Sequence, residues 1–174
     1  MLLGEHITLR ARHEADVPVL QAQLYEDVAT RSRADSRPWR PIPPDPALSP
    51  YAVTGPSEEA ACFSVVETAT GELAGEALLW GIDAHNRSAH LGLALLPGHR
   101  GRGFAADVVG ALCRYGFLVL GLNRLQLETL AENTPMVRAA VRAGFTVEGT
   151  LRRSAWADGE FRDQVVLGLL AGEA

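Results

Sequence analysis

The chain has 174 residues, of which 47% are hydrophobic and 21% charged, and its formal net charge at pH 7 is −5. This length and balance predict one globular domain, residues 1–174, with a sizeable core. The net negative charge argues against general nucleic-acid binding, no apolar run reaches the length of a membrane span, and the N-terminus lacks the pattern of a secretion signal, so we expect a soluble, cytoplasmic protein.

The first half of the chain predicts a strand, a helix, a long loop and a hairpin. Ile7–Ala11 alternates between apolar and polar residues, and Glu14–Val28 carries apolar residues at helical spacing. Arg37–Pro56 contains seven prolines and is expected to be a long functional or floppy loop. The segments that follow are expected to be a short helical turn and two hairpin strands: Ser57–Ala61, then Cys62–Glu67 and Leu73–Gly81.

The second half predicts alternating strands and helices. The expected segments are a strand at Ala89–Leu96, a central helix at Gly103–Leu120, a strand at Leu125–Thr129, a short helix from Asn133 or Thr134 to Gly144, and strands at Phe145–Leu151 and Gln164–Leu170. The resulting order, β-α-loop-β-β-β-α-β-α-β-β, predicts an α/β domain with a mixed central sheet flanked by helices. Cys62 and Cys113 lie in apolar segments without metal-ligand spacing, so we expect two buried, inert thiols and no metal.

The segment His99-Arg100-Gly101-Arg102-Gly103-Phe104-Ala105 connects a predicted strand to the central helix. Its glycines allow backbone amides to approach a ligand closely, and the helix directs its free N–H groups and positive dipole end to the same place. This arrangement is typical of a phosphate-binding turn.

Gly101 to Ala106 also satisfies the dinucleotide fingerprint G-x-G-x-x-A, and Glu128 lies where a ribose-binding acid would be expected. Several strands precede this motif, however, and the chain that follows is too short for the remainder of a doubly wound sheet. The sequence therefore argues against a dinucleotide enzyme.

Four features resemble the Gcn5-related N-acetyltransferase (GNAT) superfamily, and within it the RimJ/RimL-like subgroup. The first, Arg100-Gly101-Arg102-Gly103-Phe104-Ala105, is similar to the superfamily signature R/Q-x-x-G-x-G/A. The others are similar to features of the subgroup: Asn133 followed by Gly144-Phe145, the closing Asp158–Asp163 segment, and the early Pro38-Trp39 pair. The resemblance covers nearly the whole chain.

The resemblance implies that acetyl-CoA is the co-substrate. Its diphosphate would lie on the turn from Gly101 through Gly103, Phe104 and Ala105 to Ala106, with Arg100 or Arg102 close by. Its pantetheine would extend along Leu93, Ala94 and Leu95, which requires that strand to part from its parallel neighbour at Leu125–Thr129. Asn133 and Met136 would contact the cofactor beyond this point, and Arg138 or Arg142 would reach the adenosine 3′-phosphate.

Acetyl transfer requires a neutral amine, a donor for the developing negative charge and departure of the thiolate. His90 is the preferred base, with Glu76 and Glu67 as alternatives that position a water. An open backbone N–H near Leu95 would stabilise the negative charge. Many relatives carry a serine where this chain has Met136, which cannot donate a proton, so Tyr115 or a water would protonate the thiolate, or it would leave unassisted.

Aromatic residues are the candidates for the acceptor pocket. Trp39 and Tyr51 of the proline-rich loop would form its walls, Trp80 and Trp156 would contribute, and Trp156 could instead lie at a homodimer interface. The function implied is transfer of an acetyl group from acetyl-CoA to the primary amine of a protein N-terminus or a small molecule. The alternative is a catalytically degenerate acyl-CoA-binding or regulatory module.

Overall fold

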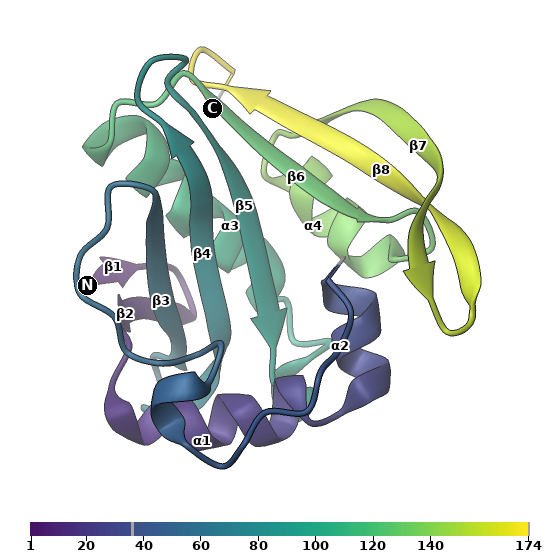
Figure 1. Cartoon of the computed structure of the whole chain (residues 1–174). Coiled ribbons are helices and arrows are strands. Elements are labelled where there is room, and N and C mark those ends of the chain that lie inside the picture. Colours follow the sequence, from purple (N-terminus) through teal and green to yellow (C-terminus); the bar gives the residue numbers. More distant parts are fainter. Residues whose placement is uncertain (36, 174) are drawn as a thin grey trace.

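The computed structural model describes residues 1–35 and 37–173, and its strands form one eight-stranded sheet in the order β1-β2-β3-β4-β5-β6-β8-β7 (Figure 1). The strands are β1 (Leu2–Leu3), β2 (Ile7–Ala11), β3 (Ala60–Glu67), β4 (Leu73–Asp83), β5 (Ser88–Leu95), β6 (Arg124–Leu130), β7 (Thr146–Ala157) and β8 (Glu160–Leu170). Within the described residues, β5 and β6 form the only parallel pair. The mixed sheet is therefore confirmed.

Helices cover both faces of this sheet. The α-helices are α1 (Val17–Leu20), α2 (Val28–Ala34), α3 (Phe104–Arg114) and α4 (Thr134–Arg142), and short π-helical segments extend α1 and α3. In Figure 1, α3 and α4 lie behind the sheet, whereas α1 and α2 lie on the side of the viewer. No helix in the described chain is both long and apolar enough to cross a membrane.

The main core lies between the sheet and α3. Val108 and Leu112 of α3 are fully buried, as are Leu79 of β4 and Leu125 of β6. One face of α3 is therefore packed against the sheet. The helix ends at Gly121, whose left-handed φ of +64° is readily adopted by glycine, so this predicted stop is confirmed.

The parallel pair separates soon after it begins. Pairing of β5 with β6 covers only Ser88–His90 against Arg124–Gln126. Beyond His90 the strands diverge, as Figure 1 shows, and the β5 edge at Leu91–Leu95 has no strand partner in the described chain. The parting required for a pantetheine arm is therefore present in the fold.

Asp16 attaches the first helical segment to the sheet. Its buried carboxylate accepts hydrogen bonds from both Arg10 Nη atoms (2.6 and 2.9 Å), from the His13 N–H (2.9 Å) and from Ser64 Oγ (2.7 Å). Burial alone would raise the pKa of Asp16, but the hydrogen bonds from Arg10, His13 and Ser64 hold it well below its usual range. The ionised carboxylate thereby joins β2, β3 and the start of α1.

Two expected helical segments differ from the structure. The helix predicted over Glu14–Val28 ends before Asp27, which instead caps the separate helix α2 by accepting a hydrogen bond from the Thr30 N–H (3.3 Å). The helical turn predicted at Ser57–Ala61 is wrong. Ser57 Oγ accepts from the Glu59 N–H (3.1 Å) in a local turn, and the two alanines that follow pair with β4.

Candidate active site

Two cavities meet on β5. The first, which we call the splay cleft, has a volume of about 620 Å³ and lies where β5 and β6 diverge. The second, the front pocket, has a volume of about 580 Å³ and lies between β4, β5 and α2. Leu91–Ala94 of β5 line both cavities, as do Asp35 and Glu128. Two ligands bound in these cavities would therefore meet along this stretch of β5.

The β5 wall of the splay cleft presents backbone groups. The Leu96 N–H donates to the Ala74 carbonyl of β4 (2.8 Å). Because backbone groups alternate between the two edges of a strand, those of Leu91, Leu93 and Leu95 lie on the opposite edge, toward the cleft. An extended chain containing amides can pair with such an edge as an added strand does.

The turn after β5 ends at the N-terminus of α3. Gly101 and Gly103 have left-handed φ values of +73° and +83°, and Gly103 is the N-cap residue of α3. Glycine has no side chain, and no side chain caps α3 within the described residues, so its first-turn N–H groups are available to a ligand. This arrangement fits a diphosphate.

The two arginines of the turn have different partners. Arg100 Nε donates to the Leu95 carbonyl (3.0 Å), and Arg100 lines the splay cleft. Arg102 makes two hydrogen bonds to Glu67, one of 3.0 Å from Nη1, and its guanidinium lies 4.7 Å from the centre of the Phe104 ring. Arg100 is therefore the arginine placed beside a ligand in the cleft.

The predicted cofactor residues fall into two groups. Those that line the splay cleft are Leu93, Ala94, Leu95, Arg100, Gly101, Ala105, Asn133 and Met136. Those that do not are Arg102, Gly103, Phe104, Ala106 and Arg138. Phe104 is buried in the core and Arg138 is exposed on α4.

Asn133 organises the opposite wall of the cleft. Its Oδ1 accepts from the Met136 N–H (3.4 Å), and its Nδ2 donates to Thr129 Oγ1 at the end of β6 (2.9 Å). This residue is thus a helix cap that also joins α4 to β6. Tyr115 lines neither cavity, because its ring packs edge-on against Phe63 beside the core, so the structure does not support it as the thiolate donor.

Helix α2 extends across the splay cleft from the β5 side to the β6 side. Asp35, just after α2, lines the cleft together with β5 residues. Arg33 bonds to Glu132, after β6, at 2.5 Å and to Asp158, in the β7–β8 turn, at 2.6 Å. These exposed ion pairs join elements on the two sides of the cleft.

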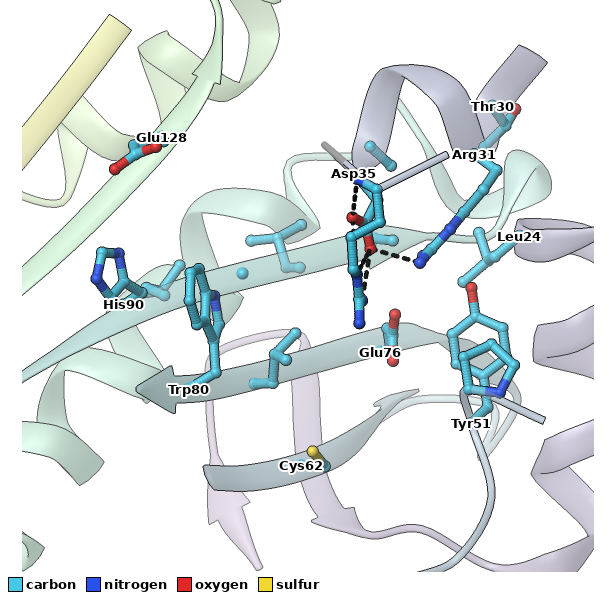
Figure 2. Close-up of a pocket in the computed structure, with 18 of the residues that line it drawn as sticks. Leu24, Thr30, Arg31, Asp35, Tyr51, Cys62, Glu76, Trp80, His90 and Glu128 are labelled. Atoms are coloured by element: carbon cyan, nitrogen blue, oxygen red, sulfur yellow. Dashed lines mark hydrogen bonds and ion pairs between the residues drawn. The ribbon is translucent and has the colours of Figure 1, made fainter. Parts of the chain in front are cut away.

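Alternate residues of β4 and the continuous stretch His90–Ala94 of β5 line the front pocket. Glu76, Leu78 and Trp80 of β4 pair with Ala94, Gly92 and His90 of β5, and all six line the pocket. His90 and Trp80 stack at one end, as Figure 2 shows.

The two loop aromatics proposed for the acceptor pocket have different positions. Tyr51 is buried and lines the front pocket. Trp39 does not line it and packs in a small apolar cluster, where its Nε1 donates to the Tyr25 carbonyl (3.0 Å). The indole therefore lies in that cluster and is held there by its N–H group. The prediction that Trp39 forms a wall of the acceptor pocket is wrong.

Cys62 also lines the front pocket and is exposed, so the prediction of two buried thiols is correct only for Cys113. Cys62 lies on β3 opposite Leu78, on the sheet face that points into the pocket. Its partly desolvated surroundings raise the pKa of the Cys62 thiol.

Ion pairs occupy the inner end of the front pocket. Arg12 Nη2 lies 2.8 Å from Glu76 Oε2. Burial raises the pKa of Glu76, against the opposing effect of Arg12. The Asp35 carboxylate accepts hydrogen bonds from Arg31 and from Arg37 Nη2, the latter at 2.7 Å. Both carboxylates are therefore engaged by guanidinium groups.

The sequence reasoning considered Glu128 only as the ribose-binding acid of the rejected dinucleotide interpretation and missed it as a residue of this site. It lines both cavities from β6, and Figure 2 shows it near His90 and away from Glu76. Gln126 Nε2 donates to it at 2.8 Å, and no arginine pairs with it among the described residues. The sequence feature that could have revealed it is the alternation of residues in Leu125–Thr129, because alternation in a strand places Gln126 and Glu128 on the same face of the sheet.

Comparison with known proteins identifies the family. The family model described as an acetyltransferase (GNAT) domain matches residues 6–146. The chain belongs to the GNAT family of acetyltransferases. An N-acetyltransferase named p20 from Bacillus licheniformis is 30% identical, and the match covers 99% of this chain and 97% of p20.

Other relatives of this GNAT acetyltransferase act on named amines. A spermidine N(1)-acetyltransferase from Vibrio cholerae is 32% identical over 57% of each chain. The crystal structure of spermidine N-acetyltransferase from the same organism, in complex with CoA and spermine, has the same fold: its TM-score is 0.84 over 97% of each chain, at 24% identity. The chain is thus an acetyl-CoA-dependent N-acetyltransferase, and the splay cleft fits the co-substrate.

Proposed function

We propose that this GNAT acetyltransferase acetylates the primary amine of a small molecule held in the front pocket. The observation that carries the proposal is that both cavities are lined by Leu91–Ala94 of β5. An amine in the front pocket would face a thioester that lies along the open edge of β5. Direct attack by the amine needs no covalent enzyme intermediate.

The residues around this junction supply the polar groups for the reaction. The amine attacks the thioester carbon of acetyl-CoA, the carbon–sulfur bond breaks as the amide bond forms, and coenzyme A leaves as a thiolate that departs unassisted or takes a proton from water. Glu128, which lacks an arginine partner in the described chain, attracts the protonated amine and receives a proton from it, directly or through water. His90, at the same end of the pocket, is the second candidate base, and the Leu95 N–H is the candidate donor to the thioester oxygen.

Two observations support a small molecule as the acceptor of the acetyl group. The relatives from Vibrio cholerae and Escherichia coli are named spermidine N(1)-acetyltransferases, and spermidine is a small molecule with primary amines. The front pocket is a cavity of about 580 Å³, within the range of pockets for small ligands. Membership in the RimJ/RimL-like subgroup stays a proposal based on Asn133 and Gly144-Phe145, and a homodimer through Trp156 stays a prediction.

Release of free thiol from acetyl-CoA tests the proposal. The protein is incubated with acetyl-CoA and, in turn, small amines and short peptides with a free N-terminus, and mass spectrometry identifies the acetylated product. We expect thiol release that depends on a small amine and matches the amount of product. Binding of CoA without turnover on any amine would contradict the proposal and favour the degenerate binding module.

A further inference from the structure

The charged side chains of the front pocket are separated between its two ends. Figure 2 shows Arg31, Asp35 and Glu76 at one end and Glu128 at the other. We call the charged group at the first end the arginine cluster, which consists of Arg12, Arg31, Asp35, Arg37 and Glu76. With each group in its usual ionic form, this cluster has three guanidiniums and two carboxylates, an excess of one positive charge.

Most of the arginine cluster is withdrawn from solvent. The side chains of Arg12, Arg31, Asp35 and Glu76 are only 6%, 12%, 14% and 15% exposed. The charges of these four groups balance one another, so the excess positive charge is that of Arg37, whose side chain is exposed beside them. An oxyanion contributed by a ligand would balance the excess.

The cluster also has hydrogen-bond donors available. A guanidinium has five N–H donors. The Arg31 side chain donates to Asp35 and also lies beside the Tyr51 hydroxyl. Arg37 uses Nε and Nη2 on the same carboxylate, and its side chain is 77% exposed. Both arginines line the pocket and can turn unused N–H groups toward an anion.

We propose that the acceptor is a primary amine that also carries an oxyanion, either a carboxylate or a phosphate. Arg31 and Arg37 bind the oxyanion while Glu128, at the opposite end, faces the ammonium group. This inference rests on the proposed function and specifies its substrate class. A polyamine is disfavoured because it brings positive charge to a cluster that already has an excess.

Matched acceptors that differ only in the anionic group test the inference. The pairs are γ-aminobutyrate with butylamine, phenylalanine with phenethylamine, and O-phosphoethanolamine with ethanolamine; spermidine represents the polycations. We expect kcat/KM for the anionic member of at least one pair to exceed that of its partner by roughly tenfold or more. The carboxylate and phosphate pairs distinguish the two kinds of oxyanion.

Variants assign the preference to the cluster. Arg31→Gln combined with Arg37→Gln should remove the preference for the anionic member, whereas Arg31→Lys, which keeps the charge, should retain most of it. Arg40→Gln is the matched control, because Arg40 is exposed on the same loop and lines neither cavity.

The possible failures are distinguishable. Turnover with a preference for neutral amines or spermidine would overturn the inference and leave the proposed function intact. So would an anion preference that survives in the double glutamine variant. Absence of turnover with every amine would overturn the proposed function itself.

Discussion

His90 stacks on Trp80 with ring centroids 4.3 Å apart and ring planes inclined by 19°. The two residues are paired neighbours on β4 and β5, so their side chains lie on the same face of the sheet. The indole therefore orients the imidazole at the end of the front pocket where Glu128 also lies.

His90→Ala should lower kcat by roughly tenfold or more, because general-base catalysis typically contributes at least that much. The KM for acetyl-CoA should change little, since His90 does not line the splay cleft. Steady-state kinetics with a saturating amine measure both quantities. Trp80→Leu serves as a comparison that removes the stacking partner and keeps the imidazole. Unchanged turnover in His90→Ala would remove His90 from the mechanism.

Glu128→Gln should lower kcat by about 10² or more, because the amide has nearly the same size but cannot accept a proton. Glu160→Gln is the control, since Glu160 lies in the exposed β7–β8 hairpin and lines neither cavity. The same kinetic assay compares the two variants. If Glu128→Gln and Glu160→Gln turn over equally, a proton-accepting role for Glu128 is wrong.

The sequence predicted the backbone of the site better than its side chains. The apolar strand, the Gly101–Gly103 turn and the following helix are local patterns, so their positions could be predicted before any tertiary contact was known. The role of Glu128 could not, because it depends on the divergence of β5 from β6. Trp39 was misplaced since its hydrogen bond to the Tyr25 carbonyl is a tertiary contact between a loop and a helix.

The charged end of the front pocket was also missed, for a related reason. Arg12, Arg31 and Glu76 are distant in sequence and come together only in the folded chain, where all three line the front pocket. The prediction of one helix over Glu14–Val28 did not separate α2, which begins after its N-cap residue Asp27. Local sequence patterns therefore predict most helices and strands, whereas the front pocket forms through contacts between residues that are distant in sequence.

Alkylation of Cys62 by iodoacetamide should raise the KM for the amine and leave the KM for acetyl-CoA nearly unchanged, because Cys62 lines only the front pocket. Since the pKa of this thiol is raised, its alkylation rate should still increase above pH 9. Cys113 is buried and should not react in the folded protein. Cys62→Ala should resist the reagent, and inhibition of that variant would place the sensitive group elsewhere.

Asp16→Asn should destabilise the protein at pH 7 by about 3 kcal/mol, because it removes one partner of a buried ion pair with Arg10. The pKa of Asp16 is lowered on folding, so its stabilising contribution is present above the unfolded pKa of about 3.9 and is lost as pH falls further. Denaturant unfolding at several pH values should show the gap between wild type and variant closing below about pH 4. Asp45→Asn, in an exposed loop, should cost much less. A gap that widens in acid would contradict this account.

A crystal structure with coenzyme A tests the central claim most directly, namely that the parted strands and the glycine turn form the co-substrate site. We predict that the diphosphate lies on the backbone amides between Gly101 and Ala105, with the pantetheine extended along Leu93–Leu95 and its thiol directed toward Glu128. Coenzyme A bound elsewhere on the molecule, or a glycine turn left empty at saturating coenzyme A, would contradict the account.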